Sequence, residues 1–280
     1  MEKILHGGRD EKYKLLEDSL DRLLVDLKKN DAHATFFCLG KMASEYPDVI
    51  RKIADEGHDI GCHSNTHKWL TTLNEVDLKK DTHAAITALE MVWGKKVKSY
   101  RAPAFSITPN NPHVIETLGE CGIELDSSIF PTTRDFGGYP SFGDDTPCRI
   151  VKGSSMLKEL PITIMSFMGK KIAFSGGGYF RLLPYWLIKR EMKKREYNIC
   201  YFHLSDLIPE QKRLMTKEQY EDYFKEPGTL KNRLTRYVKS NIGSGDSFVK
   251  LERLMKDFKF MSVDEAEKVI DWDNTRIVKV

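Results

Sequence analysis

Two histidines four positions apart, His63 and His67, are the residues of this sequence best suited to do chemistry. His63 ends residues 58–63, which we expect to form a strand, and His67 lies in the polar turn that follows. A helical turn between them would direct both imidazoles toward one point. Imidazole nitrogen binds zinc well, and also cobalt, nickel or iron. We therefore predict a divalent metal site here, against the simpler interpretation that two surface histidines happen to be near neighbours.

Three further reactive residues, Arg101, Asp126 and His203, also lie at the ends of strand-like segments. Each alone has an ordinary structural explanation: an arginine in a surface ion pair, an aspartate capping a helix, or a histidine at the edge of the core. Ligand sites in parallel α/β sheets, however, collect at the carboxyl ends of the strands. We therefore predict that these residues share one site with the two histidines.

The elements that would position them alternate between helix and strand along the chain. The expected helices are residues 11–29, 46–56, 75–93, 112–121, 184–194 and most of 229–258, and the expected strands are residues 34–39, 58–63, 99–103, 125–128 and 198–203. Residues 132–155, rich in Gly, Pro, Asp and Ser, are expected to form a long surface loop. This alternation predicts βα units around a parallel sheet, in a single domain over residues 1–280.

The composition limits the remaining classes of function. The net charge is only +3, and basic and acidic residues are mixed along the chain, which argues against a nucleic-acid partner. The five cysteines include no Cys-x-x-Cys pair, so a cysteine-rich zinc site is not expected and a reducing compartment is favoured. No signal peptide and no long apolar segment is visible, so we expect no membrane span and a cytoplasmic location. The sequence does not indicate an oligomeric state.

Several motifs, in the same order, resemble those of the polysaccharide deacetylase family, also called carbohydrate esterase 4 or the NodB-homology family. The similar segments are residues 34–37 (ATFF) with Gly40, 46–47 (YP), 57–60 (GHDI), 63–67 (HSNTH), 101–103 (RAP), 126–131 (DSSIFP) and 202–203 (FH). The resemblance runs from about residue 12 to residue 265. Residues 100–107 and 176–184 are most similar to a bacterial subgroup associated with exopolysaccharide synthesis.

This resemblance implies a distorted (β/α)7-type barrel and a metal-dependent hydrolase that removes N-acetyl groups from an amino-sugar polysaccharide, an oligosaccharide or a precursor. His63 and His67 would hold zinc, with cobalt or nickel as alternatives, and Ser64 would brace the turn between them. The metal would polarise the amide carbonyl and activate water.

The resemblance also assigns roles outside the metal ligands. His203 would be the general acid, kept charged by Asp126, and Arg101 would orient a catalytic aspartate. The residues expected to contact substrate are Pro103, Phe130, Phe202 and Leu204.

The sequence departs from the family at its beginning. The family's first motif is a strand that ends in two acidic residues, one the general base and one a metal ligand. Here Met1 is followed almost directly by the first helix, and Asp10 is the nearest carboxylate. We therefore expect a barrel that is incomplete at its first strand. A missing base would cost about 10²–10⁴-fold in rate.

Two other functions stay open at this level. Related barrels open cyclic amides such as ureides, and the segments at residues 101–103 and 126–128 would fit that chemistry as well. A chain without its base aspartate would also suit a catalytically inactive carbohydrate-binding relative.

Overall fold

The structure, a computed structural model, describes residues 9–134, 137–207, 214–224, 226–241 and 243–280. The chain forms two compact units. The sheet unit comprises Asp31–Ile172, Tyr197–Ile199 and Phe260–Val280, and the helical unit comprises Met1–Asn30, Ala173–Glu196 and Cys200–Lys259. Residues 1–8, on which the expectation about the first motif falls, lie outside the described residues. The single domain over residues 1–280 stays a prediction.

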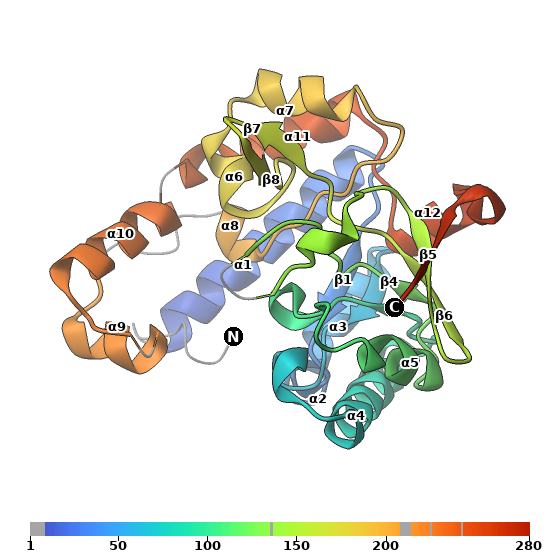
Figure 1. Ribbon diagram of the computed structural model, residues 1–280. Helices are drawn as coiled ribbons and strands as arrows, with labels where there is room; N and C mark the ends of the chain where they lie inside the picture. Colours follow the sequence, from blue (N-terminus) through green and yellow to red (C-terminus); the bar gives the residue numbers. More distant parts are fainter. Residues whose placement is uncertain (1–8, 135–136, 208–213, 225, 242) are drawn as a thin grey trace. The chain divides into compact units, whose positions relative to one another are not determined.

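The described residues of the sheet unit form a seven-stranded sheet in the order β1-β2-β3-β4-β6-β5-β9 (Figure 1). The strands are β1 (Thr35–Cys38), β2 (Asp59–Cys62), β3 (Ser99–Tyr100), β4 (Leu125–Asp126), β5 (Cys148–Lys152), β6 (Ser155–Glu159) and β9 (Arg276–Lys279). From β1 to β4 and on to β6 every pairing is parallel, whereas β5 runs antiparallel to β6 and parallel to β9. The carboxyl ends of β1, β2, β3, β4 and β6 therefore lie along one edge.

The helices of this unit bury their apolar faces against the sheet. They are α2 (Gly40–Glu45), α3 (Pro47–Asp55), α4 (Glu75–Trp93), α5 (His113–Glu120) and α12 (Val263–Val269). Helices α3 and α4 pack on β2, α5 packs on β5 and β6, and α12 packs on β4. Helix α4 begins where the Asn74 side chain accepts a hydrogen bond from the Asp77 amide, and ends at Gly94, whose φ of 75° suits glycine. A separate hairpin joins β7 (Met165–Phe167) and β8 (Lys170–Ile172).

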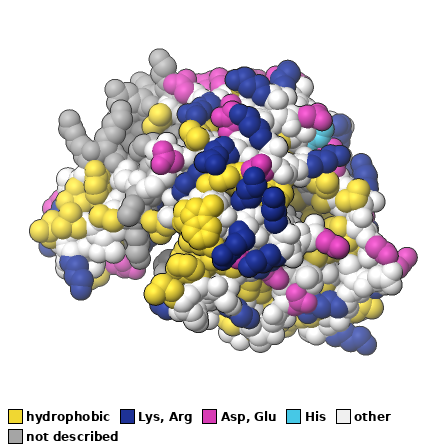
Figure 2. All heavy atoms as spheres, turned by 90° about the horizontal axis from the view of Figure 1, so that it is seen from above, with side chains coloured by type: hydrophobic (Ala, Val, Ile, Leu, Met, Phe, Trp, Pro, Cys, Tyr) yellow, Lys and Arg dark blue, Asp and Glu magenta, His cyan; other side chains and the backbone are white. Residues whose placement is uncertain are grey.

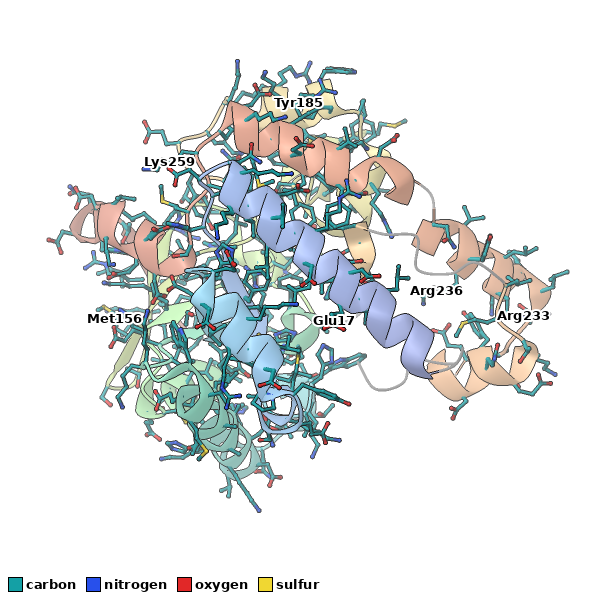
Figure 3. The ribbon with its side chains drawn as sticks, turned by 180° about the vertical axis from the view of Figure 1, so that it is seen from behind. Glu17, Met156, Tyr185, Arg233, Arg236 and Lys259 are labelled. Atoms are coloured by element: carbon teal, nitrogen blue, oxygen red, sulfur yellow. The ribbon has the colours of Figure 1, made fainter. Side chains whose placement is uncertain are left out.

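The helical unit is built on α1 (Arg9–Lys29), whose Leu20, Leu24 and Leu27 are buried at helical spacing. The other helices are α6 (Gly177–Leu182), α7 (Tyr185–Met192), α8 (Leu204–Leu207), α9 (Lys217–Phe224), α10 (Leu230–Asn241) and α11 (Ser247–Asp257). Helices α8 and α11 pack on α1, and α11 runs beside it in Figure 3.

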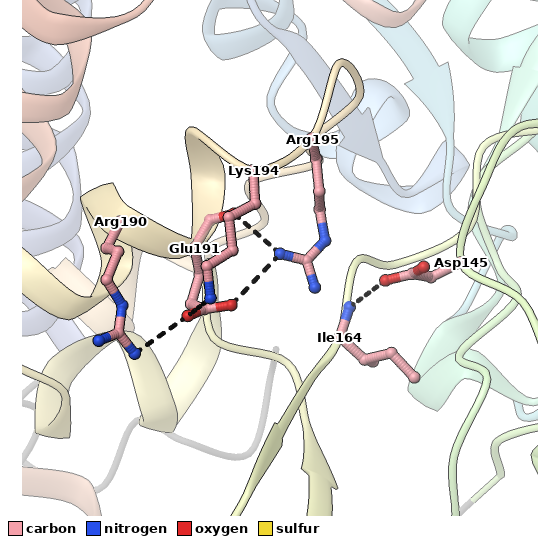
Figure 4. A network of polar contacts seen from close by, with 6 residues as sticks. All are labelled: Asp145, Ile164, Arg190, Glu191, Lys194 and Arg195. Carbon is pink, nitrogen blue, oxygen red and sulfur yellow. Dashed lines mark hydrogen bonds and ion pairs between the residues drawn. The ribbon is translucent and has the colours of Figure 1, made fainter.

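A buried acid on α7 shows how the helical unit places a charge in its interior. Glu191 is buried, and Oε1 lies 2.6 Å from Lys194 Nζ and 3.3 Å from Arg190 Nη2 (Figure 4). Arg195 donates from Nη1 to the Glu191 carbonyl at 2.8 Å. The hydrogen bond from Lys194 acts first to lower the pKa of Glu191, which keeps the carboxylate charged despite its burial.

The predicted mixed α/β fold with a parallel sheet is confirmed. Most expected helices are present, and β1 to β4 lie inside the segments expected to be strands. Closure of the sheet into a barrel stays a prediction.

Two local predictions are wrong. Residues 198–203 were expected to be a strand, but they contribute only an isolated bridge from Tyr201 to Gly176. Residues 132–155 were expected to be a loop, yet they contain β5, which turns into β6 at Gly153, where φ is +56°. The Gly, Pro, Asp and Ser residues before Cys148 led to the loop prediction, because composition alone does not reveal a short strand beside such a segment.

The face shown in Figure 2 carries basic and acidic side chains close to one another. Among the described residues, no helix has the length and apolar character needed to cross a membrane.

We expect Gly40→Ala to destabilise the protein. Gly40 is buried at the start of α2, and an added Cβ would collide with the Ala85 backbone of α4 and lie 2.7 Å from Asn65 Oδ1. Since a packed helix contact must move to make room, the free energy of unfolding should fall by about 1–3 kcal/mol. Urea denaturation measures this change. Ser44→Ala, on an exposed turn of the same helix, is the control, and equal effects of the two changes would contradict the explanation.

Candidate active site

The turn that carries His63 and His67 is fixed by hydrogen bonds to its neighbours. The His63 amide donates to the Cys38 carbonyl at 2.9 Å, which continues the β1–β2 pairing by one residue. Ser64 is fully buried, and its Oγ accepts a hydrogen bond from the His67 amide at 2.9 Å. Ser64 and His67 have φ values of 67° and 61°, so the turn is not the helical turn expected from the sequence. Two left-handed residues bring the histidines together instead.

The two imidazoles lie beside each other, with ring centroids 5.1 Å apart. His63 Nδ1 is 2.6 Å from the Arg101 carbonyl oxygen, so Nδ1 carries the proton and donates it. The lone pair is then on Nε2, the form in which a histidine binds a metal while a carbonyl orients its ring. This donor chemistry fits a divalent metal.

The ligand set is nevertheless incomplete within the described part of the chain, which gathers no group of three His, Cys, Asp or Glu side chains suited to a metal ion. The metal itself therefore stays a prediction.

Arg101 follows β3 and joins the ends of three neighbouring strands. Its amide donates to the Cys62 carbonyl of β2 at 2.9 Å. Its guanidinium donates from Nε to the Ser127 carbonyl at 3.0 Å and from Nη2 to Ser127 Oγ at 2.7 Å, beyond the end of β4. The guanidinium carbon also lies 4.4 Å from the centre of the Phe37 ring.

Asp126 is the last residue of β4 and is fully buried. Its Oδ1 accepts a hydrogen bond from Ser128 Oγ at 2.5 Å, and Ser128 Oγ in turn accepts from the Ala102 amide at 2.7 Å. Burial raises the pKa of Asp126, although hydrogen bonds and the charge of Arg101 act in the opposite direction. The structure thus brings His63, His67, Arg101 and Asp126 to neighbouring strand ends of the sheet unit.

Two of the residues expected to contact substrate belong to this unit. Pro103 and Phe130 are both buried, and the Phe130 ring is 5.2 Å from that of Phe105. The guanidinium of Arg134 lies over both rings, at 4.9 Å from Phe105 and 4.6 Å from Phe130. Their contact with substrate stays a prediction.

His203 belongs to the helical unit and immediately precedes α8 rather than ending a strand. Its side chain is 70% exposed, and Nδ1 lies 3.2 Å from Asp206 Oδ2. Phe202 packs against Phe180 with ring centroids 4.8 Å apart, and Leu204 is the first residue of α8. The predicted general acid is therefore held by Asp206, and Phe202 by a ring contact with Phe180, within this unit.

Asp206 is a functional candidate that the sequence analysis missed. Its Oδ2 also accepts a hydrogen bond from the His203 amide at 3.0 Å, and its Oδ1 lies 3.9 Å from Arg181 Nη1. Burial alone would raise the pKa of Asp206, but the hydrogen bonds from His203 and the charge of Arg181 lower it. An acid three residues after a histidine is a recognisable capping pattern and could have been noticed.

Glu159 is the second candidate that was missed. It is the last residue of β6, fully buried, and lies in register with Asp126 of β4. The strand-end argument that selected Asp126 would have selected Glu159 too, had residues 155–159 been recognised as a parallel strand.

Two family models match this chain in succession. Residues 10–124 match the polysaccharide deacetylase family, and residues 127–268, about half of the chain, match a domain of unknown function, DUF3473. The matches thus divide an α/β protein into a deacetylase-like first part and a second part of the DUF3473 type. The chain belongs to the family defined by the DUF3473 domain, and its residues 10–124 are similar to the polysaccharide deacetylases.

Individual relatives are similar over shorter segments. A peptidoglycan-N-acetylglucosamine deacetylase of Bacillus cereus is 34% identical over 89 residues, which are 32% of this chain and 32% of that protein. A chitooligosaccharide deacetylase of Rhizobium leguminosarum bv. trifolii is 32% identical over 85 residues, covering 29% of this chain and 40% of the relative. The match thus spans well under two thirds of either relative. A solved polysaccharide deacetylase structure from Bacillus cereus aligns with a TM-score of 0.35 and 30% identity, over 39% of this chain and 54% of that one.

We expect Arg101→Lys to loosen the strand ends although it keeps the positive charge. Lysine has one nitrogen in place of the two, Nε and Nη2, that reach the Ser127 carbonyl and hydroxyl, and it has no plane to stack on Phe37. The free energy of unfolding should fall by about 1–3 kcal/mol. Thermal or urea unfolding measures it, with Arg134→Lys, an exposed arginine over two aromatic rings, as the control expected to cost less than about 1 kcal/mol. Equal losses of unfolding free energy in the two variants would contradict the role assigned to Arg101.

Proposed function

We propose that this protein is a metal-dependent hydrolase that removes N-acetyl groups from an amino-sugar polysaccharide or its precursor. The observation that carries the proposal is the 2.6 Å contact from His63 Nδ1 to the Arg101 carbonyl, beside a second imidazole. A surface coincidence of two histidines gives no reason for one ring to be oriented by the end of a neighbouring strand. The similarity of residues 10–124 to the polysaccharide deacetylases supports the same reaction.

His63 and His67 are the residues that would hold the metal, and zinc suits a histidine site. When bound, such an ion polarises the amide carbonyl of the substrate. Zinc sites use three or four protein ligands as a rule, so the proposal includes a third ligand besides this pair. Within the turn, Ser64 holds the backbone that separates the two rings.

His203 is proposed as the general acid that gives a proton to the departing amine. A general acid needs a hydrogen-bond partner that orients its ring while it gives up the proton. Asp206 provides such a partner within the helical unit, and the predicted contribution of Asp126 to this role remains a separate proposal. Phe202 and Leu204 flank the histidine and would cover the acetyl methyl group.

The substrate polymer is proposed to be an exopolysaccharide containing N-acetylated amino sugars. This finer assignment is supported by the resemblance of residues 100–107 and 176–184 to the bacterial exopolysaccharide subgroup. The relatives that match act, by their names, on peptidoglycan N-acetylglucosamine and on chitooligosaccharides, which are also polymers or oligomers of N-acetylated sugars.

We expect acetate release from an N-acetylglucosamine oligomer in the presence of zinc or cobalt, and we expect His203→Ala to lower its rate by about 10²–10⁴-fold. The loss follows from removing the proton donor while leaving the two histidines of the sheet unit in place. Enzymatic detection of acetate measures the rate. His83→Ala is the matched control, because His83 is an exposed histidine on α4.

Other outcomes point to other functions. Sugar binding without acetate from the wild-type protein would contradict the proposal and favour a non-catalytic carbohydrate-binding protein. Turnover of cyclic ureides alone would contradict the substrate class.

A further inference from the structure

The ends of β4 and β6 place two carboxyl groups side by side inside the sheet unit. Asp126 and Glu159 are partners in the parallel register of these strands, and both are fully buried. Two adjacent ionised carboxylates without solvent are strongly unfavourable, because each charge loses its hydration and repels the other.

Only one oxygen of each carboxyl group accepts a hydrogen bond from another residue that the structure describes. Asp126 Oδ1 accepts from Ser128 Oγ at 2.5 Å, and Glu159 Oε1 accepts from the Ile129 amide at 3.0 Å. The other oxygens, Asp126 Oδ2 and Glu159 Oε2, are buried and have no hydrogen-bond donor. A proton on one of them would satisfy both, since a protonated carboxyl donates and a carboxylate accepts.

We infer that Asp126 and Glu159 share one proton, and that this carboxylic acid–carboxylate pair is a positioning device for the strand ends that carry Arg101 and orient His63. The pair then carries one negative charge, which the Arg101 guanidinium balances. The positioning role rests on the proposed function, whereas the shared proton does not.

The surroundings of the pair agree with a single negative charge. Burial raises the pKa of Glu159 well above its usual range, and the neighbouring charge of Asp126 raises it further. Arg101 acts on both carboxyls in the opposite direction. Tyr100, Tyr197 and Cys148 also face the pair, and burial raises the pKa of each, of Cys148 to about 12, so all three stay neutral near pH 7.

A continuous series of contacts leads from the pair to the metal-binding turn. Asp126 holds Ser128, and Ser128 Oγ accepts the amide of Ala102. The preceding carbonyl, that of Arg101, accepts the proton of His63 Nδ1. If both carboxyls were ionised, or if one lost its hydrogen bond to the other, the position of Ser128 would change. The carbonyl that orients the His63 ring would then move with it. Glu159 is therefore a positioning residue that acts without touching the substrate.

The shared proton gives a pH dependence whose sign is defined. The folded state keeps the proton, whereas an unfolded glutamate loses it above its ordinary pKa of 4.5. Stability from the pair is therefore complete below that pKa and declines as the pH rises. Relative to the double variant Asp126→Asn/Glu159→Gln, the wild-type unfolding constant should rise about tenfold per pH unit from about pH 5 until the folded pair loses its proton.

Urea unfolding at several pH values measures this ratio, with the exposed Glu124→Gln as the matched control. A ratio that does not change with pH would overturn the shared proton. Infrared spectroscopy gives a second measurement that needs only the wild-type protein and a single variant, and so does not depend on the folding of the double variant. The carbonyl stretch of a protonated carboxylic acid should be present in the wild-type protein at neutral pH and lost in Glu159→Gln, and its absence from the wild type would also overturn the inference.

The positioning role is tested by cobalt affinity, measured by calorimetry. Glu159→Ala should weaken cobalt binding by about 10–100-fold, whereas Glu159→Gln, which still donates to Asp126, should stay within about threefold of the wild type. Equal weakening in both variants, or no weakening in either, would overturn the positioning role. A wild-type protein that binds no cobalt would instead contradict the proposed metal site and leave the unfolding and infrared tests intact.

Discussion

Parallel pairing of β2, β3 and β4 is the constraint on which the candidate site depends. It places His63, Arg101 and Ser127 one residue beyond successive strand ends, so that backbone hydrogen bonds set their separation before any side chain contributes. The side chains then add specificity: the imidazole contacts a carbonyl of the next strand, and the guanidinium contacts a carbonyl of the strand after that. The site is thus an extension of the sheet's own hydrogen bonding.

The two serines buried along this edge are tolerated because each uses its hydroxyl both as donor and as acceptor. Ser127 Oγ donates to the Leu160 carbonyl at 2.9 Å, and Ser128 links Asp126 to the Ala102 amide. Fully buried serines between strand ends are costly unless both their donor and acceptor capacities are used. Such a network specifies one arrangement of the loops, whereas an apolar edge would allow several.

Much of this arrangement could be predicted from sequence, for identifiable reasons. The helix over 75–93 and the strand before His63 have clear periodicity and end signals, and the motif order gave the similarity to the polysaccharide deacetylases. The strand β5 and the pairing of Glu159 could not be predicted, because a strand of five residues after a Pro- and Asp-rich segment has no periodicity of its own. His203 was assigned to a strand since Cys200 to Phe202 are apolar, yet they pack as an irregular segment before α8.

Residue 101 contributes to the site in two independent ways: its backbone carbonyl orients His63, and its side chain links the strand ends. The carbonyl at position 101 is supplied by whichever amino acid stands there, whereas the contacts to Ser127 and Phe37 require a planar cation. A substitution at position 101 would therefore remove the guanidinium contacts, whereas the carbonyl that accepts the His63 proton would remain. A relative with another residue at this position would keep the hydrogen bond that orients the imidazole, while losing the side-chain link between the ends of β3 and β4.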